Sequence, residues 1–316
     1  MGTGAIPLAE AEEALARLDP AVLFSDVDGT LVGRDGSLFA DLDGNLTLAA
    51  AEALVAASAA GLDVVLVSGR NETQLREATR LLGLRDAIGE LGAVLLLGRE
   101  TELLWGEAPR GLGATPREAL ERSGALALAL AAFAGRLEPH DPWNHGRVGT
   151  ALLRGRVDPA AVEAALAAAG LGWARLLDNG RLRGSYPPLA GDGPAHAYHL
   201  LPAGVSKAAT AAAYLRRRGL RAEQAAAIGD SPADLELAGV VGAAFLVRNG
   251  AWAAAHDAPR PLALEGEHPR RAAAGATPAA GPGAGTPVIV TPSSAGQGFA
   301  EAVRALLERR QRRLPG

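Results

Sequence analysis

The chain has 316 residues, a formal net charge of −4 and no cysteine. This length favours two domains over one, and the charge balance gives no basic surface of the kind that binds nucleic acid. The lack of cysteine excludes a disulfide framework and a thiolate zinc site, and no apolar run reaches the ~20 residues of a transmembrane helix. We therefore expect a cytoplasmic protein that binds neither nucleic acid nor membrane, and the sequence leaves its oligomeric state open.

The first part of the chain alternates between apolar runs typical of buried strands and segments of helical composition. The apolar runs end in polar, glycine-containing turns, and Gly83 ends the second helical segment. The predicted elements are a strand with its C-terminal loop at 20–31, a helix at 47–61, a strand at 62–70, a helix at 72–83 and a strand region at 87–97. Strands and helices in this order are the signature of a parallel α/β sheet.

The pattern changes after residue 97. The elements predicted there are a strand at 148–157, a helix at 158–170, a hairpin at 173–184 with its turn at Asn179-Gly180, and a strand at 195–201. Asn-Gly is a strong signal for a two-residue hairpin turn. These elements predict a separate α+β domain at 98–197.

The α/β alternation then resumes. The predicted elements are a helix at 206–219, a strand at 225–230, a helix at 231–239, a strand at 242–250, a short strand at 287–291 and a terminal helix at 298–313. Residues 257–286 are rich in proline, alanine and glycine, which predicts a flexible loop. The predicted fold class is therefore α/β: a doubly wound parallel-sheet core formed by 1–97 and 198–316, with the 98–197 domain inserted.

Two carboxylates, Asp26 and Asp28, stand two residues apart at the end of the first predicted strand. Their side chains begin on the same side of the strand, and Gly29 allows the backbone to turn sharply after them. Carboxylates this close repel each other unless a cation neutralises them or they have different tasks. Hard oxygen ligands suit Mg²⁺, and such a pair offers one nucleophile and one proton carrier. Taken alone, the pair is equally well explained as a capping aspartate followed by an Asp-Gly turn.

The second predicted strand ends in Ser68, Gly69 and Arg70. The serine hydroxyl, the adjacent amides and the guanidinium can donate hydrogen bonds to phosphoryl oxygens. A Ser-Gly pair after a strand is also common in simple turns, and Arg70 could instead pair with an acidic neighbour.

Lys207 is the only lysine among 31 basic residues. It stands where a helix begins, and a positive charge is unfavourable there unless an anion lies nearby. An ammonium is a compact charge that can bridge a carboxylate and a phosphoryl group, whereas arginine presents a planar fork. The alternative is a surface lysine without a special role.

Asp230 follows a third apolar strand and could complete a metal site opposite Asp26, because the carboxyl ends of parallel strands meet at one edge of a sheet. Asp234 has two possible roles. With Ser231 as N-cap and Pro232 as the first helical residue, it forms a capping-box pattern. It could also orient a metal-bound water from outside the ligand set.

Taken in order, these motifs resemble those of the haloacid dehalogenase superfamily of aspartyl phosphotransferases. The resemblance covers 20–97 and 198–250. The inserted domain is similar to the larger C2-type cap of the Cof-like, sucrose-phosphatase and mannosyl-3-phosphoglycerate-phosphatase branch. Two features depart from that branch: "ELGA" at 90–93 lacks the common Asn-Gly pair, and "SPAD" at 231–234 lacks an asparagine before the acid.

The resemblance implies a role for each motif residue. Asp26 is the nucleophile and a Mg²⁺ ligand, Asp28 is the general acid and base and offers its backbone carbonyl to the metal, and Asp230 is a further Mg²⁺ ligand. Lys207 stabilises the nucleophile and the phosphate. The implied phosphate-binding residues are Thr30, which supports the first loop, Ser68, Gly69 and Arg70; Ser231 and Asp234 lie around the metal site.

The activity implied is Mg²⁺-dependent hydrolysis of a phosphomonoester through an aspartyl-phosphate, with a small phosphorylated metabolite, such as a sugar phosphate, as substrate. A phosphomutase of the same superfamily would use the same core and return the phosphoryl group to the substrate. A non-enzymatic phosphoacceptor is a third possibility, but Asp28 argues against it because a proton carrier at that position promotes turnover. A binding protein for sugar phosphates without catalytic activity is the fourth.

Overall fold

The computed structural model describes residues 5–182, 186, 188–250 and 286–312. It consists of two compact units, one formed by Met1–Leu66 with Ala211–Gly316 and the other by Val67–Thr210. The predicted flexible loop at 257–286 lies outside the described residues except for its last residue. No helix in the described ranges is long and apolar enough to cross a membrane.

The first unit contains a parallel sheet. Its strands, in spatial order, are β1 (Ile6–Pro7), β13 (Val288–Val290), β12 (Ala243–Leu246), β11 (Ala225–Gly229), β2 (Val22–Ser25) and β3 (Asp63–Val67). Each of these neighbours pairs in parallel. The central strands are buried along their length, which explains why their sequences are continuous apolar runs instead of alternating patterns.

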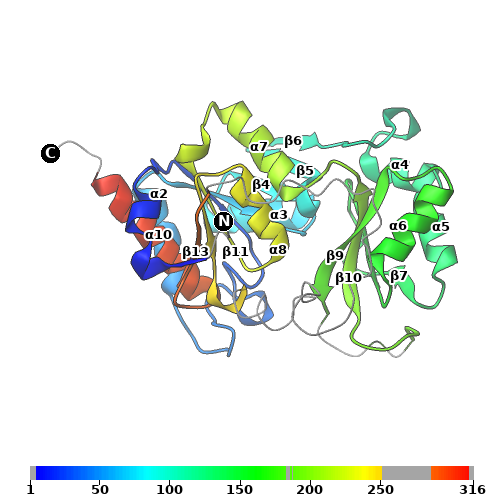
Figure 1. The fold of residues 1–316 in the computed structure, drawn as a ribbon, viewed down its shortest axis with the longest axis horizontal. Helices are drawn as coiled ribbons and strands as arrows, with labels where there is room; N and C mark the ends of the chain where they lie inside the picture. Colours follow the sequence, from blue (N-terminus) through cyan, green and yellow to red (C-terminus); the bar gives the residue numbers. More distant parts are fainter. Residues whose placement is uncertain (1–4, 183–185, 187, 251–285, 313–316) are drawn as a thin grey trace, which may run out of the picture. The chain divides into compact units, whose positions relative to one another are not determined.

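The described part of the first unit also contains helices. They are α1 (Glu12–Leu15), α2 (Ala49–Ala59), α7 (Lys207–Arg218), α8 (Pro232–Leu235) and α10 (Ala295–Gln311), and the short 3-10 helices are Leu8–Glu10, Arg34–Gly36, Ala222–Gln224 and Glu236–Gly239. Helices α2 and α10 lie side by side (Figure 1). The first four residues of α7 belong to the second unit. The predicted elements at 20–31, 47–61 and 225–230 are confirmed as β2, α2 and β11. The strand predicted at 242–250 is confirmed in its first half as β12, whereas residues 248–250 are helical.

The second unit begins where β3 ends. Helix α3 (Glu72–Leu82) follows, and its N-cap Asn71 forms a capping box with Gln74 while Gly83 ends it in a left-handed conformation. Next come three antiparallel strands, β4 (Asp86–Gly89), β5 (Val94–Leu97) and β6 (Glu100–Leu103), with a 3-10 turn at Glu90–Gly92. The predicted strand region at 87–97 is thus a pair of strands with a tight turn between them.

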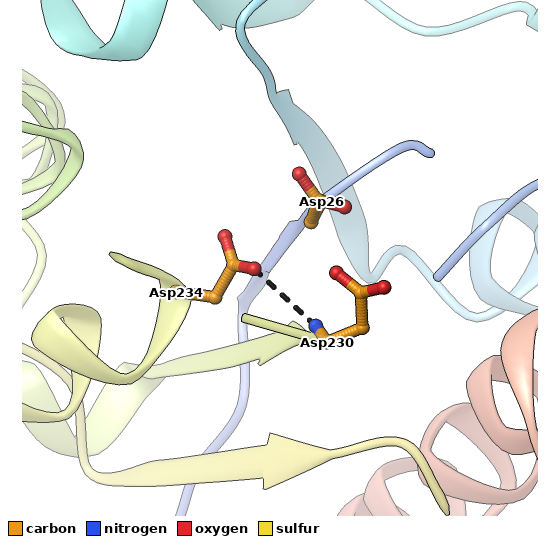
Figure 2. Close-up of side chains that lie close together, drawn as sticks. All are labelled: Asp26, Asp230 and Asp234. Carbon is orange, nitrogen blue, oxygen red and sulfur yellow. Dashed lines mark hydrogen bonds between the residues drawn. The ribbon is translucent and has the colours of Figure 1, made fainter. Parts of the chain in front are cut away.

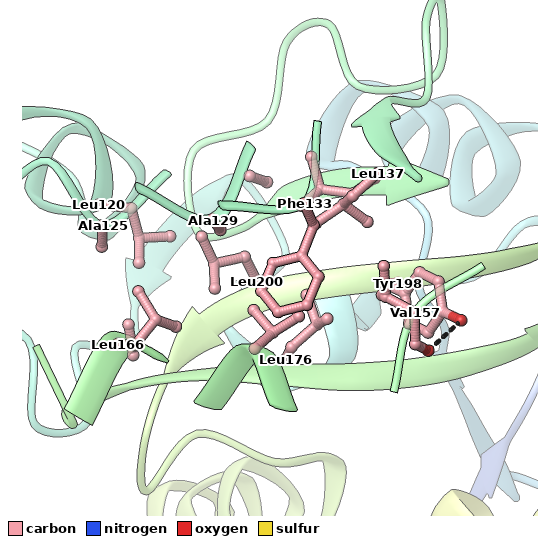
Figure 3. Close-up of a cluster of buried hydrophobic side chains, with 14 residues drawn as sticks. Leu120, Ala125, Ala129, Phe133, Leu137, Val157, Leu166, Leu176, Tyr198 and Leu200 are labelled. Carbon is pink, nitrogen blue, oxygen red and sulfur yellow. Dashed lines mark hydrogen bonds between the residues drawn. The ribbon is translucent and has the colours of Figure 1, made fainter. Parts of the chain in front are cut away.

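The second unit also contains a four-stranded antiparallel sheet in the order β7 (Leu137–Pro139), β8 (Ala151–Gly155), β10 (His196–Pro202), β9 (Ala174–Arg181). Its other helical elements are α4 (Pro116–Arg122), α5 (Ala125–Ala132), α6 (Pro159–Ala168) and a 3-10 turn at Arg110–Leu112. The α helices lie against one face of the sheet (Figure 1), where side chains such as Leu176, Leu200 and Phe133 form a buried core (Figure 3). The opposite face of β10 carries His199.

The predicted hairpin turn at Asn179-Gly180 is wrong. Strand β9 runs through both residues to Arg181 and pairs with β10, whose register shifts between His196 and Tyr198. Two residues of β9 therefore face one residue of β10, and Gly180 supplies the positive φ of 101° at this irregularity. The antiparallel sheet agrees with an inserted α+β domain, while its boundaries at 98 and 197 stay a prediction.

Candidate active site

Three carboxylates from separate segments of the first unit converge (Figure 2). Asp26 follows β2, Asp230 follows the neighbouring parallel strand β11, and Asp234 lies in α8. One oxygen of each carboxylate lies within 4.8 Å of an oxygen of the other two. Asp26 and Asp234 are buried. Carboxylates that share such a space repel one another, and a positive ion relieves that repulsion, so this all-oxygen set fits a hard divalent cation.

Backbone contacts hold the turn after β2 close to Asp230. The Asp26 amide donates to the Ile228 carbonyl of β11 at 3.0 Å, which extends the pairing of the two strands to the nucleophile candidate. Gly29 has a φ of +86°, and a Cβ at this position would lie 2.3 Å from Asp230 Oδ2. Glycine is therefore required here both for the backbone conformation and for the close approach of the carboxylate.

The structure confirms one of the two roles suggested for Asp234, the helix cap, while the orientation of a metal-bound water stays a prediction. Its Oδ2 accepts hydrogen bonds from the Ser231 hydroxyl at 2.6 Å, the Ser231 amide at 3.1 Å and the Asp230 amide at 3.3 Å. This confirms the predicted capping box at the start of α8. The same carboxylate belongs to the acidic cluster, so the cap positions Asp234 directly beside Asp26 and Asp230.

Asn249 is a site residue that sequence reasoning did not identify. Its side-chain amide donates to the Gly29 carbonyl at 2.9 Å and to Asp230 Oδ2 at 3.2 Å, and its Oδ1 accepts from the Ala295 amide at 3.0 Å. It thus ties the turn after β2 to the carboxylate after β11. The available signal was its position after β12, a parallel neighbour of β11, where a polar side chain is expected at the ligand edge of the sheet.

Asp28 and Thr30 lie in the same turn as Gly29. The Asp28 side chain is exposed and does not belong to the three-carboxylate cluster, in keeping with the implied use of its backbone carbonyl. Thr30 is fully buried, and its Oγ1 has no hydrogen-bond partner among the residues that the structure describes. The catalytic and phosphate-binding roles of these two residues stay predictions.

The predicted phosphate-binding residues of the second unit form an ordered turn. Ser68 is buried, its amide donates to the Ile88 carbonyl of β4 at 2.9 Å, and its hydroxyl accepts from the Arg70 amide at 3.3 Å. The Gly69 carbonyl accepts from the guanidinium of Arg147 at 2.9 Å. Burial lowers the pKa of Arg147 to about 10, so the guanidinium remains charged at neutral pH.

Lys207 is the first residue of α7 and is only 5% exposed, which contradicts the alternative of an ordinary surface lysine. The start of α7 packs tightly on the turn after β4. A Cβ on Gly92 would lie 2.2 Å from the Ser206 carbonyl oxygen, and Thr210 Oγ1 donates to the Gly92 carbonyl at 2.7 Å. The contact of Lys207 with Asp26 stays a prediction, since the two residues belong to different units.

Glu90 is a second residue that sequence reasoning did not assign. It is fully buried, and its carboxylate accepts from the amides of Val148, Gly149 and Thr150 and from the Thr150 hydroxyl. The next residue, Leu91, has a positive φ of 56°. This conformation is one that asparagine adopts more readily than leucine, which gives a physical meaning to the missing Asn-Gly pair.

Comparisons with known proteins agree with this architecture. Residues 192–259 match the model of a family described as haloacid dehalogenase-like hydrolase. A comparison with curated protein sequences finds no match. Among solved structures, a protein from Thermoplasma acidophilum is 16% identical with a TM-score of 0.58, covering 91% of this chain and 98% of that one.

Two further structures share the fold. A haloacid dehalogenase-like hydrolase from Bacteroides thetaiotaomicron is 15% identical with a TM-score of 0.56, covering 90% of this chain and 99% of that one. The sucrose-phosphatase of Synechocystis, solved with sucrose and phosphate, is 15% identical with a TM-score of 0.54, covering 90% of this chain and 97% of that one. At these identities the likeness is one of fold.

The parallel sheet and the carboxylates at its edge define an α/β fold with a candidate metal site. The family match at 192–259 covers about a fifth of the chain, and over most of its length the chain shares the fold of structures that include a haloacid dehalogenase-like hydrolase.

Proposed function

We propose that the protein is a Mg²⁺-dependent phosphomonoester hydrolase that acts on a small phosphorylated metabolite through an aspartyl-phosphate. The observation that carries this proposal is the convergence of Asp26, Asp230 and Asp234 at the carboxyl ends of β2 and β11. Carboxylates that share such a space repel one another, and a divalent cation relieves that repulsion. A carboxylate is also the nucleophile that phosphoryl transfer to aspartate needs.

In the proposed first step, a carboxylate oxygen of Asp26 attacks the phosphorus and the bond from phosphorus to the leaving oxygen breaks. Asp28, which is exposed at the same turn, gives its proton to that oxygen. In the second step, Asp28 takes a proton from water, the water oxygen bonds to phosphorus, and the Asp26 carboxylate leaves. Asp28 thus ends each cycle protonated, as it began.

Mg²⁺ would be held by the carboxylates of Asp26 and Asp230 and by the backbone carbonyl of Asp28, with Ser231 and Asp234 positioning this ligand set. When bound, the ion supplies positive charge that neutralises the phosphoryl oxygens. The buried ammonium of Lys207 has the same task from the protein side, and Thr30, Ser68, Gly69 and Arg70 bind the phosphoryl oxygens.

The substrate is proposed to be a phosphorylated metabolite such as a sugar phosphate, selected by the inserted domain at 98–197. The fold shared with a sucrose-phosphatase supports a phosphorylated small molecule. The lack of cysteine suits the reducing cytoplasm, where we expect the protein to act.

A phosphatase screen across phosphorylated metabolites tests the proposal, with Mg²⁺ present and then chelated. We expect release of inorganic phosphate from at least one ester. This activity is expected to be lost when Mg²⁺ is chelated and to return when Mg²⁺ is added again. Turnover that requires a hexose bisphosphate would support a phosphomutase instead. A phosphoenzyme stable for hours, with no phosphate released, would contradict hydrolysis and support a phosphoacceptor.

A further inference from the structure

The antiparallel sheet of the second unit directs two polar side chains to the backbone of Gly69. His199 comes from β10 and Asn179 from the neighbouring strand β9. A Cβ on Gly69 would lie 3.3 Å from His199 Nε2 and 3.2 Å from Asn179 Nδ2. Two nitrogen atoms from adjacent strands therefore meet beside the turn to which we assign phosphate binding.

The imidazole of His199 has an unsatisfied hydrogen-bonding group at this point. His199 is fully buried, and its Nε2 has no hydrogen-bond partner in the part of the chain that the structure describes. A buried polar atom without a partner costs free energy, so proteins keep such atoms where a ligand or water completes the bond. Nε2 is therefore a candidate for ligand binding.

A chain of hydrogen bonds sets which imidazole nitrogen carries the proton. The Glu90 carboxylate accepts from three backbone amides and, at 2.9 Å, from the hydroxyl of Thr150. Since the single hydroxyl proton of Thr150 is directed to Glu90, its oxygen accepts at its 3.1 Å contact with His199 Nδ1. Nδ1 therefore carries the proton.

The imidazole of His199 is neutral at neutral pH. Burial, together with the positive charges of Arg147 and Lys207, holds the pKa of His199 well below its ordinary value. A neutral imidazole that is protonated on Nδ1 has a lone pair on Nε2. His199 Nε2 is consequently an acceptor, whereas the neighbouring Asn179 Nδ2 is a donor.

We propose that His199 and Asn179 form a specificity site that binds a hydroxyl group of the leaving group. A hydroxyl donates its proton to His199 Nε2 and accepts from Asn179 Nδ2, so it matches this adjacent acceptor and donor. The substrate class is then a phosphate ester of a polyhydroxylated alcohol. This inference rests on the proposed function, because a phosphoryl group held at Ser68–Arg70 brings the leaving group to Gly69. Glu90 and Thr150 are positioning residues that fix the tautomer of His199.

Kinetics with substrates that do and do not carry hydroxyl groups test this site. The probes are glucose 6-phosphate, fructose 6-phosphate, glycerol 3-phosphate and p-nitrophenyl phosphate, of which only the last lacks a hydroxyl on the leaving group. In Asn179→Ala and His199→Phe, we expect kcat/KM for the best hydroxylated ester to fall at least about tenfold, with p-nitrophenyl phosphate changed less than about threefold. Asp178→Asn, a substitution on the same strand beside Asn179, is the matched control and is expected to change neither.

Substitutions at Thr150 test the positioning role. In Thr150→Val, we expect the same fall in kcat/KM, confined to the hydroxylated esters. Thr150→Ser keeps the hydroxyl, so this variant is expected to retain the wild-type kcat/KM toward these esters. Equal losses for all four probes, or no loss in Asn179→Ala, would overturn the specificity site while leaving the phosphatase proposal intact. Because Asn179 is exposed, this variant is expected to fold even if His199→Phe does not. A wild-type protein that hydrolyses none of the four probes would instead count against the proposed function.

Discussion

The Cα of Gly29 stands so close to the side chain of Asp230 that an added Cβ would lie 2.3 Å from Oδ2. Gly29 belongs to the turn after β2 and Asp230 follows β11, so this contact joins two of the segments that build the acidic cluster. The same turn is held from the other side by Asn249, which donates to the Gly29 carbonyl and to Asp230. The geometry of the cluster therefore depends on residues that are not acidic.

Gly29→Ala tests this close contact. The new methyl group forces the Asp230 carboxylate away from Asp26 and Asp234, so we expect the Mg²⁺ concentration for half-maximal activity to rise at least about tenfold. The matched control is Gly219→Ala, where φ is +65° and nothing lies within 4 Å. The control is expected to lose about 1 kcal/mol of unfolding free energy with unchanged Mg²⁺ dependence. Equal Mg²⁺ dependence in both variants would refute the role of the contact.

Asn249→Ala removes both donors that hold the turn and Asp230. Partners that orient ligands typically contribute a factor of about 10–100 to metal affinity, and we expect a loss in that range. Mg²⁺ titration of phosphatase activity measures it. Asn45→Ala is the control, because that side chain lies in an exposed loop and donates to Asp41. If Asn249→Ala binds Mg²⁺ as tightly as this control, Asn249 does not position the ligands.

Glu90→Ala tests the buried carboxylate. Its removal leaves three amides and one hydroxyl without their acceptor, so we expect a loss of about 3 kcal/mol or more in unfolding free energy. Glu90→Gln keeps the side-chain volume, but its NH₂ group faces one of these N–H or O–H donors and cannot accept from it. The loss of unfolding free energy in Glu90→Gln is expected to be smaller than in Glu90→Ala. Urea unfolding measures both. Glu100→Gln, an exposed change in the same unit, is expected to stay within about 0.5 kcal/mol of the wild type, and an equally small effect at Glu90 would contradict the assigned role.

The two buried histidines predict a pH dependence of stability. Desolvation lowers the pKa of His199 well below its ordinary value of 6.5 and also lowers that of His140. Below pH 6.5 the unfolded chain therefore binds protons that the folded protein does not, and the free energy of unfolding falls as the pH drops. Urea unfolding at about pH 7.5 and about pH 5.5 is expected to show this fall.

The variant His199→Gln isolates the contribution of one histidine. Its stability is expected to depend less steeply on pH than that of the wild type, whatever its absolute stability, because one of the two groups responsible is gone. His145→Gln is the control, since the His145 side chain is 73% exposed. If the pH dependence of stability is unchanged in His199→Gln, the pKa of this imidazole is the same in the folded and the unfolded protein, which would contradict the prediction.

The sequence predicted those features that depend on local patterns. Helix α3 was bounded correctly because Gly83 ends it, and the capping box at Ser231 and Asp234 was visible as a motif of four residues. The edge shared by Asp26 and Asp230 followed from the rule that parallel strands present their carboxyl ends together. These inferences need only residue type and spacing.

Features that depend on tertiary contacts were missed or misread. The Asn179-Gly180 pair satisfies the chemistry of a hairpin turn and of a strand irregularity equally, and the pairing of β9 with β10 decides between them. Glu90 and Asn249 belong to no motif. Val148, which donates to the Glu90 carboxylate, is 58 residues away in the chain, and Gly29, which accepts from the Asn249 side chain, is 220 residues away. Only the folded backbone brings the Glu90 carboxylate to the amides at 148–150.

The most direct test of the central claim is the turnover of p-nitrophenyl phosphate by Asp26→Asn in saturating Mg²⁺, beside the wild type, with circular dichroism to verify that both are folded. The amide is nearly the same size as the carboxylate but is a very poor nucleophile. We expect the variant to retain less than about one thousandth of the wild-type kcat. A folded variant that keeps more than about a tenth of wild-type turnover would show that Asp26 does not carry the phosphoryl group.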